Sequence, residues 1–346
     1  MNADIALILA QDGVVNGAIY ALVALALVLV YAVTRVIFIP QGELVAFGAL
    51  SLASLQLGKV PATAGLLLIV GAVVAIADLW TALKRRSARM AVHAIAWNVV
   101  LPGVVVGLAF FFAPQKPALW IQMLLTLGLV VPLGPMTYRL AYQPIANASI
   151  LVLLIVSVAV HFVYVGLGLV FFGAEGSRTT PIFDRQYQIG AMTVSAQSVC
   201  VLVASLLIIA ALYLFFERAV YGKALRATAV NRVGARLVGI SATFAGKLSF
   251  GLAALMGVVS GMLVSPITTI YYDTGFLIGL KAFVAAIIGS LVSYPIAAAG
   301  ALLVGLLESF SSFWASAFKE VIVFTLIIPV LLWRSLTSRV IEEDED

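Results

Sequence analysis

The chain has 346 residues, of which 63% are hydrophobic and only 10% charged, with a net charge of +5 and a mean hydropathy of +1.16. Soluble proteins are roughly half apolar, so this composition excludes a soluble globular domain. The single cysteine, Cys200, excludes an intramolecular disulfide and any multi-cysteine metal cluster. Charge-free runs approach the length of about 20 residues that crosses a membrane, and predict an all-α polytopic membrane protein.

Apolar runs predict about eleven membrane segments. Two of them, 40–57 and 277–292, are short and rich in small residues, so we expect partial helices there. In chain order the segments are 13–34, 40–57, 64–82, 91–112, 118–136, 150–172, 196–216, 245–265, 277–292, 296–312 and 320–333. They make one transmembrane domain over 1–341, followed by an acidic tail at 342–346. Asp4 stands where a signal peptide carries its positive region, so we expect no cleaved leader.

Basic residues between the segments predict the orientation of the chain. The stretch 84–89 holds four basic residues and no acid, 217–247 holds six, and Arg334 and Arg339 follow the last segment. Because Lys and Arg gather on the cytoplasmic side, we expect the N-terminus outside and the C-terminus inside. The longest outer loop is then 173–197. Two interpretations of it stay open: a face that meets a soluble partner, and a plain connector.

Charged residues inside apolar segments are candidates for a transport pathway. Glu43, Lys281 and Glu308 lie in predicted spans, where an ionised group that faces lipid is costly. We expect each to line a pathway or a helix interface, with a structural ion pair as the alternative. Asp78 lies near the inner end of its span and is expected to reach the basic 84–89 loop.

The sequence has no pattern of a catalytic or nucleotide-binding site. Its Gly-Lys pairs lack the other residues of a phosphate-binding loop, so we do not expect ATP to bind by such a loop. Zinc-hydrolase and serine-nucleophile motifs are absent. His93 and His161 stand alone in the sequence, and we expect packed or interfacial histidines. We predict no catalytic residue, no metal site and no cofactor bound by this chain.

The stretch 221–241, YGKALRATAVNRVGARLVGIS, concentrates positive charge. After a break at Gly222, it predicts one or two short helices, with Arg232 and Arg236 on one face. Its apolar stripe consists of Val230, Val233, Leu237 and Ile240. Two interpretations are equally favoured: an element on lipid headgroups, and a knob that fits a groove on a cytoplasmic protein.

These residues resemble the cytoplasmic segment of the branched-chain amino acid (LIV-type) permease family of ABC importers, where YGRALRA…A…ARLLGI is typical. Residues 16–50, NGAIYALVALALVLVYAVTRVIFIPQGELVAFGAL, are similar to a second family motif. Residues 250–264 also resemble the family sequence. The same holds for residues 279–310, which read GLKAFVAAIIGSLVSYPIAAAGALLVGLLESF. The ordered set covers well over half of the chain.

The resemblance implies roles for named residues. The segment 217–244 would form the coupling helices that dock on a separate ATPase, through Gly222, Lys223, Arg226, Arg232, Arg236 and Gly239. The candidate residues of the translocation pathway or an interface are Gln41, Gly42, Glu43, Lys281, Phe283 and Glu308.

The chain also departs from the family pattern. Gln41 stands where His is usual, Pro40 replaces a small residue, and Val230 replaces an acidic one. The region 64–112 is longer than typical, and would add peripheral spans without a transport role. Three Gly-x-x-x-Gly pairs, which start at Gly103, Gly257 and Gly275, predict ordinary helix packing more than a dimer seam.

The resemblance implies a type II ABC-importer-like permease fold and a permease subunit of an ATP-driven importer in a bacterial inner membrane. Its expected partners are a second LIV-type permease chain, two cytoplasmic ATP-binding subunits that use ATP and Mg, and an extracytoplasmic solute-binding protein. The expected cargo is a branched-chain or other small amino acid, with urea, amides and organic acids as alternatives. An ion-gradient-driven secondary transporter is the rival function, and a membrane scaffold or enzyme is a second rival.

Overall fold

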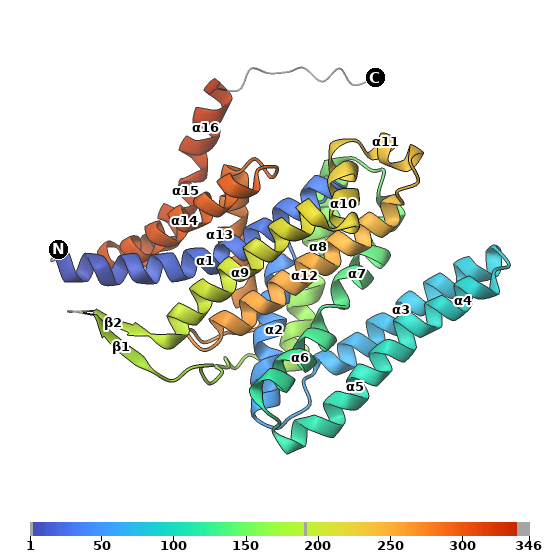
Figure 1. Cartoon of the computed structure of the whole chain (residues 1–346), viewed down its shortest axis with the longest axis horizontal. Helices are drawn as coiled ribbons and strands as arrows, with labels where there is room; N and C mark the ends of the chain where they lie inside the picture. The colour runs from blue at the N-terminus through green and yellow to red at the C-terminus, as the bar shows by residue number, and fades with distance from the viewer. Residues whose placement is uncertain (1–2, 190–191, 338–346) are drawn as a thin grey trace.

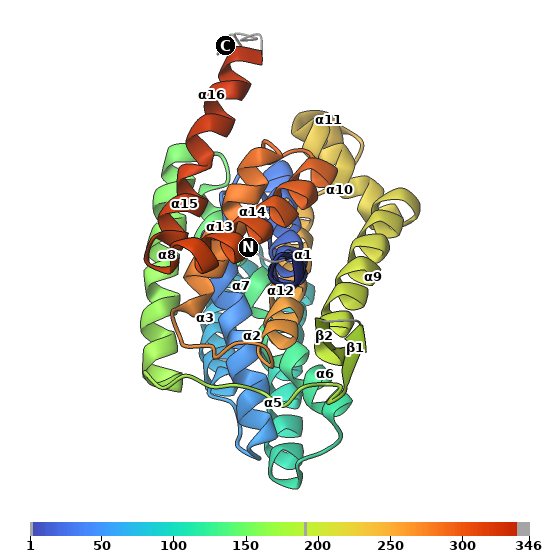
Figure 2. The same ribbon diagram turned by 90° about the vertical axis from the view of Figure 1, so that its left-hand side faces the viewer.

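The computed structural model describes residues 3–189 and 192–337 of the chain, and most of them are helical. The elements are α1 (Ala3–Thr34), α2 (Gln41–Gln56), α3 (Thr63–Lys84), α4 (Ala88–Ile95), α5 (Leu101–Phe112), α6 (Leu119–Val130), α7 (Leu133–Thr137), α8 (Ile150–Phe172), β1 (Gln186–Ile189), β2 (Met192–Ser195), α9 (Ala196–Arg218), α10 (Val220–Val230), α11 (Arg232–Leu237), α12 (Ala242–Val264), α13 (Thr274–Ile288), α14 (Tyr294–Trp314), α15 (Lys319–Thr325) and α16 (Ile327–Thr337). In Figure 1 α9 and α12 run along one diagonal, α2 runs more steeply, and the α3–α5 hairpin projects at one side. Figure 2 shows α8 and α9 on opposite flanks of the bundle.

Short π-helical and 3-10 turns join several of these helices into longer rods. The π-helical turn Ala96–Val100 links α4 to α5, and the turn Tyr138–Tyr142 extends α7. As a result, Ala88–Gln115 and Leu119–Ile145 each form one continuous apolar span.

Within the described residues, nine helical stretches are long and apolar enough to cross a membrane. They coincide with nine of the predicted segments, and the other two predicted segments correspond to the shorter α2 and α13. A helix rises about 1.5 Å per residue, so the 16 residues of α2 extend about 24 Å, less than a hydrocarbon layer of about 30 Å. The chain is therefore a multi-pass α-helical membrane protein, and α2 and α13 are partial helices.

α1 and α2 form the centre of the bundle. α1 packs most extensively against α14 and also against α12 and α13, while α2 packs against α12 and α13. A helix that is apolar on all sides is a buried helix, and 89% of the most apolar window of α1 is covered. Nearly every residue of α2 is buried as well.

Glycines bring α2 close to its neighbours. A methyl group added at Gly42 would overlap the backbone of Gly275 in α13, and one added at Gly261 in α12 would overlap the backbone of Val45. Small residues allow this approach between membrane helices. Gly103, by contrast, has no described atom within 4 Å of such a methyl group. Two of the three Gly-x-x-x-Gly pairs therefore pack inside the chain, and the pair that starts at Gly103 does not.

One end of the bundle, which we call the hairpin end, carries the segment 173–195. β1 and β2 pair there in antiparallel fashion, with Gln186 opposite Ser195. The Thr180 amide donates to Gln56 Oε1 at 2.8 Å, which holds the segment over the end of α2. The sequence carries no clear signal for these strands, because each has only four residues and lies in a polar, turn-rich loop.

The other end, which we call the basic end, carries the turn 85–87 between α3 and α4, residues 143–149, and α10 with α11 (Figure 1). The chain turns from α9 into α10 at Ala219, whose backbone is extended. The predicted break at Gly222 is wrong. Gly222 lies inside α10, because only a residue without a side chain fits against the backbone of Phe215 and Phe216. The acidic tail at 342–346 lies outside the described residues.

Candidate functional site

The first turn of α2 places two polar side chains inside the protein. Gln41 is fully buried, and its Nε2 donates to the Ala253 carbonyl of α12 at 2.9 Å. Glu43 is fully buried too, and its Oε1 lies 2.8 Å from Nδ1 of His161 in α8. Gln41 Oε1 and Glu43 Oε2 have no hydrogen-bond partner among the described residues. The turn therefore presents two unused acceptor atoms in the centre of the bundle.

Although His161 stands alone in the sequence, the packing of α8 against α2 gives it a partner. Its ring lies 4.5 Å, centre to centre, from the ring of Phe276 in α13. One helical turn along α8, the Tyr164 hydroxyl is hydrogen-bonded to the Thr137 hydroxyl of α7. The Glu43–His161 pair thus joins α2 to α8, and Phe276 adds a contact from α13. Leaving either buried polar group without its partner would cost free energy.

A second buried polar cluster lies between α1, α13, α14 and α15. Lys281 Nζ is 2.5 Å from Glu308 Oε1 and 3.2 Å from Oε1 of Glu320. The Tyr20 hydroxyl donates to the other oxygen of Glu308. Lys281 and Glu308 are buried, while the Glu320 side chain is about one-third exposed. We call this set the Lys281 cluster. It satisfies both buried charges and fastens four helices to one another.

Phe283 lies two residues beyond Lys281, and it is only partly buried. With Leu27 of α1 and Phe276 of α13, it lines a small hollow of about 10 Å³. Gly42 belongs to the close crossing of α2 and α13 described above. α13 therefore contacts both buried pairs, through Phe276 at His161 and through Lys281 at Glu308.

The predicted coupling segment folds as α10 and α11 at the basic end. Leu225 of α10 is buried in a small cluster with Leu29 and Val33 of α1, so α10 is fastened to the bundle. Asn231 ends α10, and its side chain accepts from the Gly234 amide, which caps α11. Gly239, at a φ of +87°, ends the segment in a conformation that glycine adopts without strain.

The basic residues of this segment have different surroundings. Arg232 is half-buried and donates to the Ala146 carbonyl at 3.2 Å, so it ties α11 to the loop before α8. Arg226 forms an exposed ion pair with Glu217 at 3.1 Å. Lys223 and Arg236 are exposed, and no ionic partner for either lies within the described residues. The segment therefore keeps free positive charge at its surface.

The apolar residues of the segment are exposed as well. Val230, Val233 and Leu237 are 87%, 68% and 84% exposed. The interruption at Asn231 separates Val230 from the other two, so the predicted stripe runs over two helices and not along one. We call these three residues the apolar tip. A soluble surface seldom shows such a group without an interaction to serve.

Sequence reasoning found the buried charges but not their partners. Asp78 pairs with Arg139 at 2.6 Å and accepts from Asn98 at 3.3 Å; the expectation that it reaches the 84–89 loop is wrong. Arg139 reaches Asp78 because its span packs against α3, whereas Lys84, Arg85 and Arg86 are exposed. Tyr20 carried no signal, since tyrosines are common in membrane helices. Within the described ranges, no three His, Cys, Asp or Glu side chains lie together as a metal site.

The chain matches the family model described as branched-chain amino acid transport system / permease component over residues 98–331. It is similar to the high-affinity branched-chain amino acid transport system permease protein LivH of Escherichia coli K12, with 31% identity over 207 residues, or 56% of this chain and 65% of that protein. BraD of Pseudomonas aeruginosa, of the same description, is 28% identical over 57% of this chain and 66% of its own length. The alignments thus span slightly less than two thirds of these relatives. No solved structure gives a significant match.

Proposed function

Because the chain belongs to the family of branched-chain amino acid transport system permease components, we propose that it is the membrane-spanning permease subunit of an ATP-driven importer. The observation that carries this proposal is the apolar tip at the basic end, with exposed Lys223 and Arg236 beside it. A transport protein without a nucleotide-binding motif needs an energy source. An exposed apolar and cationic knob suits a groove on an ATPase subunit, which itself uses ATP and Mg.

The proposed assembly contains four kinds of subunit. A second, related permease chain completes the pathway, two ATP-binding subunits dock at the basic end, and an extracytoplasmic solute-binding protein meets the hairpin end. This places the basic end in the cytoplasm of a bacterial cell and the hairpin end outside the inner membrane, as the positive-inside rule predicts. The chain itself carries no catalytic role in this scheme.

Movement of the docked segment has a physical route to the centre of the bundle. Arg232 ties α11 to Ala146, just before α8 begins at Ile150. α8 carries His161, which is paired with Glu43 at the start of α2. A displacement of α11 would therefore move α8 and disturb the α2 crossing. In this proposal the pathway opens by helices that shift relative to one another.

The proposed cargo is a branched-chain or other small amino acid, or a similarly compact polar solute. The relatives are named for branched-chain amino acid transport. Gln41 and Glu43 offer acceptor atoms for an ammonium or amide group, and most of the surrounding helix surface is apolar. Urea, amides and organic acids stay as alternatives, which uptake assays with a panel of solutes will separate.

The test is purification of the tagged full chain in mild detergent, followed by mass spectrometry of the proteins that stay bound. We expect a nucleotide-binding ATPase and a second permease chain to co-purify. The variant Val233→Ser with Leu237→Ser is expected to lose most of the ATPase and keep the second permease, because only the tip is changed. These two residues are preferred to Arg232, whose loss would also free the Ala146 loop.

The matched control is Leu57→Ser with Phe183→Ser, two exposed apolar residues at the hairpin end. This control is expected to keep the ATPase. If the wild-type chain purifies alone, or if the control loses the ATPase as fully as the tip variant, the docking proposal is wrong.

The rival function is a secondary transporter driven by an ion gradient. The buried Glu43–His161 pair favours it, since intramembrane carboxylate and histidine groups occur in proton relays. The discriminating measurement is amino acid uptake into liposomes that contain this chain alone. Uptake that follows an imposed proton gradient would support the rival, and its absence together with ATPase-dependent uptake would support the importer.

A further inference from the structure

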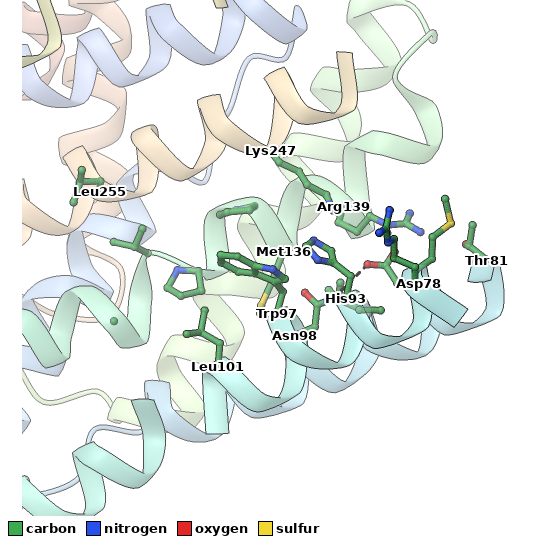
Figure 3. Close-up of a pocket in the computed structure, with 18 of the residues that line it drawn as sticks. Asp78, Thr81, His93, Trp97, Asn98, Leu101, Met136, Arg139, Lys247 and Leu255 are labelled. Atoms are coloured by element: carbon green, nitrogen blue, oxygen red, sulfur yellow. Dashed lines mark hydrogen bonds and ion pairs between the residues drawn. The ribbon is translucent and has the colours of Figure 1, made fainter. Parts of the chain in front are cut away.

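A cavity of about 820 Å³ lies between the α3–α5 hairpin and the rest of the bundle. Figure 3 shows Asp78, His93 and Trp97 on the hairpin side, and Lys247 and Leu255 of α12 on the other. The π-helical turn at Ala96–Val100 carries two of the lining residues, Trp97 and Asn98.

The part of the cavity nearest the basic end is cationic. Arg89, Arg139 and Lys247 line it together with His93, whereas Asp78 supplies the one carboxylate among the lining residues. Asp78 is already engaged, since it lies 2.6 Å from Arg139. Arg89 and Lys247 have no ionic partner within residues 3–189 and 192–337. The cavity therefore has unbalanced positive charge at one end.

The rest of the cavity wall is apolar. Leu101, Leu127, Val131 and Leu255 lie farther from the basic end, toward the middle of their spans. Trp97 lies between the two parts, its ring 5.9 Å from that of His93. An occupant that fits the whole space must carry both an anionic head and an apolar body.

The cavity is at the edge of the molecule, where helices face lipid. Trp80 of α3 and Phe110 of α5 are 64% and 61% exposed, as expected for side chains that face a membrane. Arg89 stands in the first turn of α4, and Lys247 in the second turn of α12. Both charged groups are thus near the end of a span, at the level of lipid headgroups.

We infer that this cavity is a binding site for an anionic phospholipid of the cytoplasmic leaflet. Arg89 and Lys247 bind the phosphate, and an acyl chain lies along Leu101, Leu127 and Leu255. Asp78 holds Arg139 in place and does not compete for the ligand. A free phosphate would leave the apolar wall uncovered, and a zwitterionic lipid would leave the two cations unbalanced. Basic pockets between membrane helices are known to suit acidic lipid headgroups. The α3–α5 hairpin then has a role of its own, as one wall of a lipid site.

The experiment uses the purified full chain, with its bound subunits, in detergent micelles to which phosphatidylglycerol is added. Retained lipid is counted by native mass spectrometry over a range of lipid concentrations. Phosphatidylcholine and glycerol 3-phosphate are the comparison ligands, the first without net charge and the second without acyl chains. We expect phosphatidylglycerol to bind more tightly than either.

The diagnostic variant is Arg89→Gln with Lys247→Gln. If each basic residue contributes about 1 kcal/mol, the affinity for phosphatidylglycerol should fall roughly thirty-fold, to near that for phosphatidylcholine. The matched control is Arg85→Gln with Arg86→Gln, which removes the same charge from exposed positions just before α4. The control should change the affinity less than about threefold, because those residues do not line the cavity. The pair Arg89→Lys with Lys247→Arg keeps the charge, and should keep the binding.

Three results would overturn the inference: equal binding of phosphatidylglycerol and phosphatidylcholine, equal losses in the diagnostic and control variants, or glycerol 3-phosphate that binds as tightly as the lipid. A folding defect in the double variant is recognised by gel filtration. In that case Arg89→Gln alone, at an exposed side chain, is expected to show roughly a five-fold loss.

Discussion

Lys281 lies between two carboxylates from different helices, with Nζ 2.5 Å from Glu308 and 3.2 Å from Glu320. Glu308 is buried, and Tyr20 donates to its second oxygen. The ammonium group therefore balances a charge that is largely shielded from water. Glu320 is partly exposed, so it retains hydration if Lys281 is lost. The two acids consequently respond differently to the same substitution.

Lys281→Met is expected to lower the free energy of unfolding by about 3–5 kcal/mol, because Glu308 would be left buried without a cation. Adding Glu308→Gln should recover part of this loss, since the unpaired charge is then removed and the amide still accepts from Tyr20. Unfolding in mixed detergent micelles measures both. Arg226→Met is the control, because its pair with Glu217 is about half exposed and is worth roughly 1 kcal/mol or less. Equal effects in Lys281→Met and Arg226→Met would contradict this assignment.

At the residue scale, the sequence alone identified which charges are costly in a membrane but not what stabilises them. Glu43, Lys281 and Glu308 stood out because each interrupts an apolar run. His161 is 118 positions from Glu43, and Tyr20 is 288 from Glu308. Only the packing of α8 on α2, and of α14 on α1, brings these groups together. No local pattern encodes that packing.

At the scale of elements, the crossing of α2 and α13 depends on glycine. A methyl group on Gly275 would overlap the carbonyl of Gly42, and Gly279 also lies against Gly42. Backbone atoms have no rotamers with which to avoid an added methyl group, so the helices would have to separate. One added methyl group is therefore enough to disturb the crossing of α2 and α13.

Gly275→Ala is expected to destabilise the protein by about 1–3 kcal/mol, the usual range for overpacking. Gly103→Ala is the matched control, since nothing described lies within 4 Å of the added methyl group. In a helix interior that change should be neutral, or stabilising by roughly 0.5–1 kcal/mol. Thermal unfolding of the two variants in the same detergent provides the comparison. If Gly103→Ala lowers the stability as much as Gly275→Ala does, the proposed dependence of the α2–α13 crossing on glycine is wrong.

The sequence predicted most elements well, since long apolar runs are the strongest signal that a membrane protein offers. The errors fall where that signal is weak. The four-residue strands β1 and β2 lie in a polar loop, and the turn before α10 occurs at Ala219, although glycine was the expected breaker. Gly222 is explained by close packing on Phe215, a reason that is invisible without the neighbouring helix.

At the scale of the whole molecule, the bundle has two chemically different ends. The stretch 84–89 and α10 with α11 concentrate Lys and Arg at the basic end, and the β1–β2 hairpin lies at the other (Figure 1). If the basic end is cytoplasmic, the two ends must differ in their accessibility to a reagent that cannot cross the membrane.

Single cysteines test this orientation after Cys200, the one native cysteine, is replaced by alanine. In intact spheroplasts, a membrane-impermeant maleimide is expected to label Tyr187→Cys, which replaces an exposed residue of β1. Arg85→Cys should react only after the cells are permeabilised. Inverted membrane vesicles should show the opposite pattern. Labelling of Arg85→Cys in intact spheroplasts would reverse the proposed topology.

The enclosure of α2 has a consequence for how the protein is made. α2 carries Glu43 and Gln41, yet the two helices that pack most extensively against it, α12 and α13, follow about 200 residues later in the chain. At translation rates of roughly 5–20 residues per second, α2 waits on the order of ten seconds or more before these two neighbours exist. During that interval Gln41 lacks its partner, the Ala253 carbonyl of α12, and the neighbours already made are α1, then α6 and α8. The central helix is therefore made early and completed late, so its polar first turn depends on these earlier helices, or on the insertion machinery, until α12 and α13 arrive.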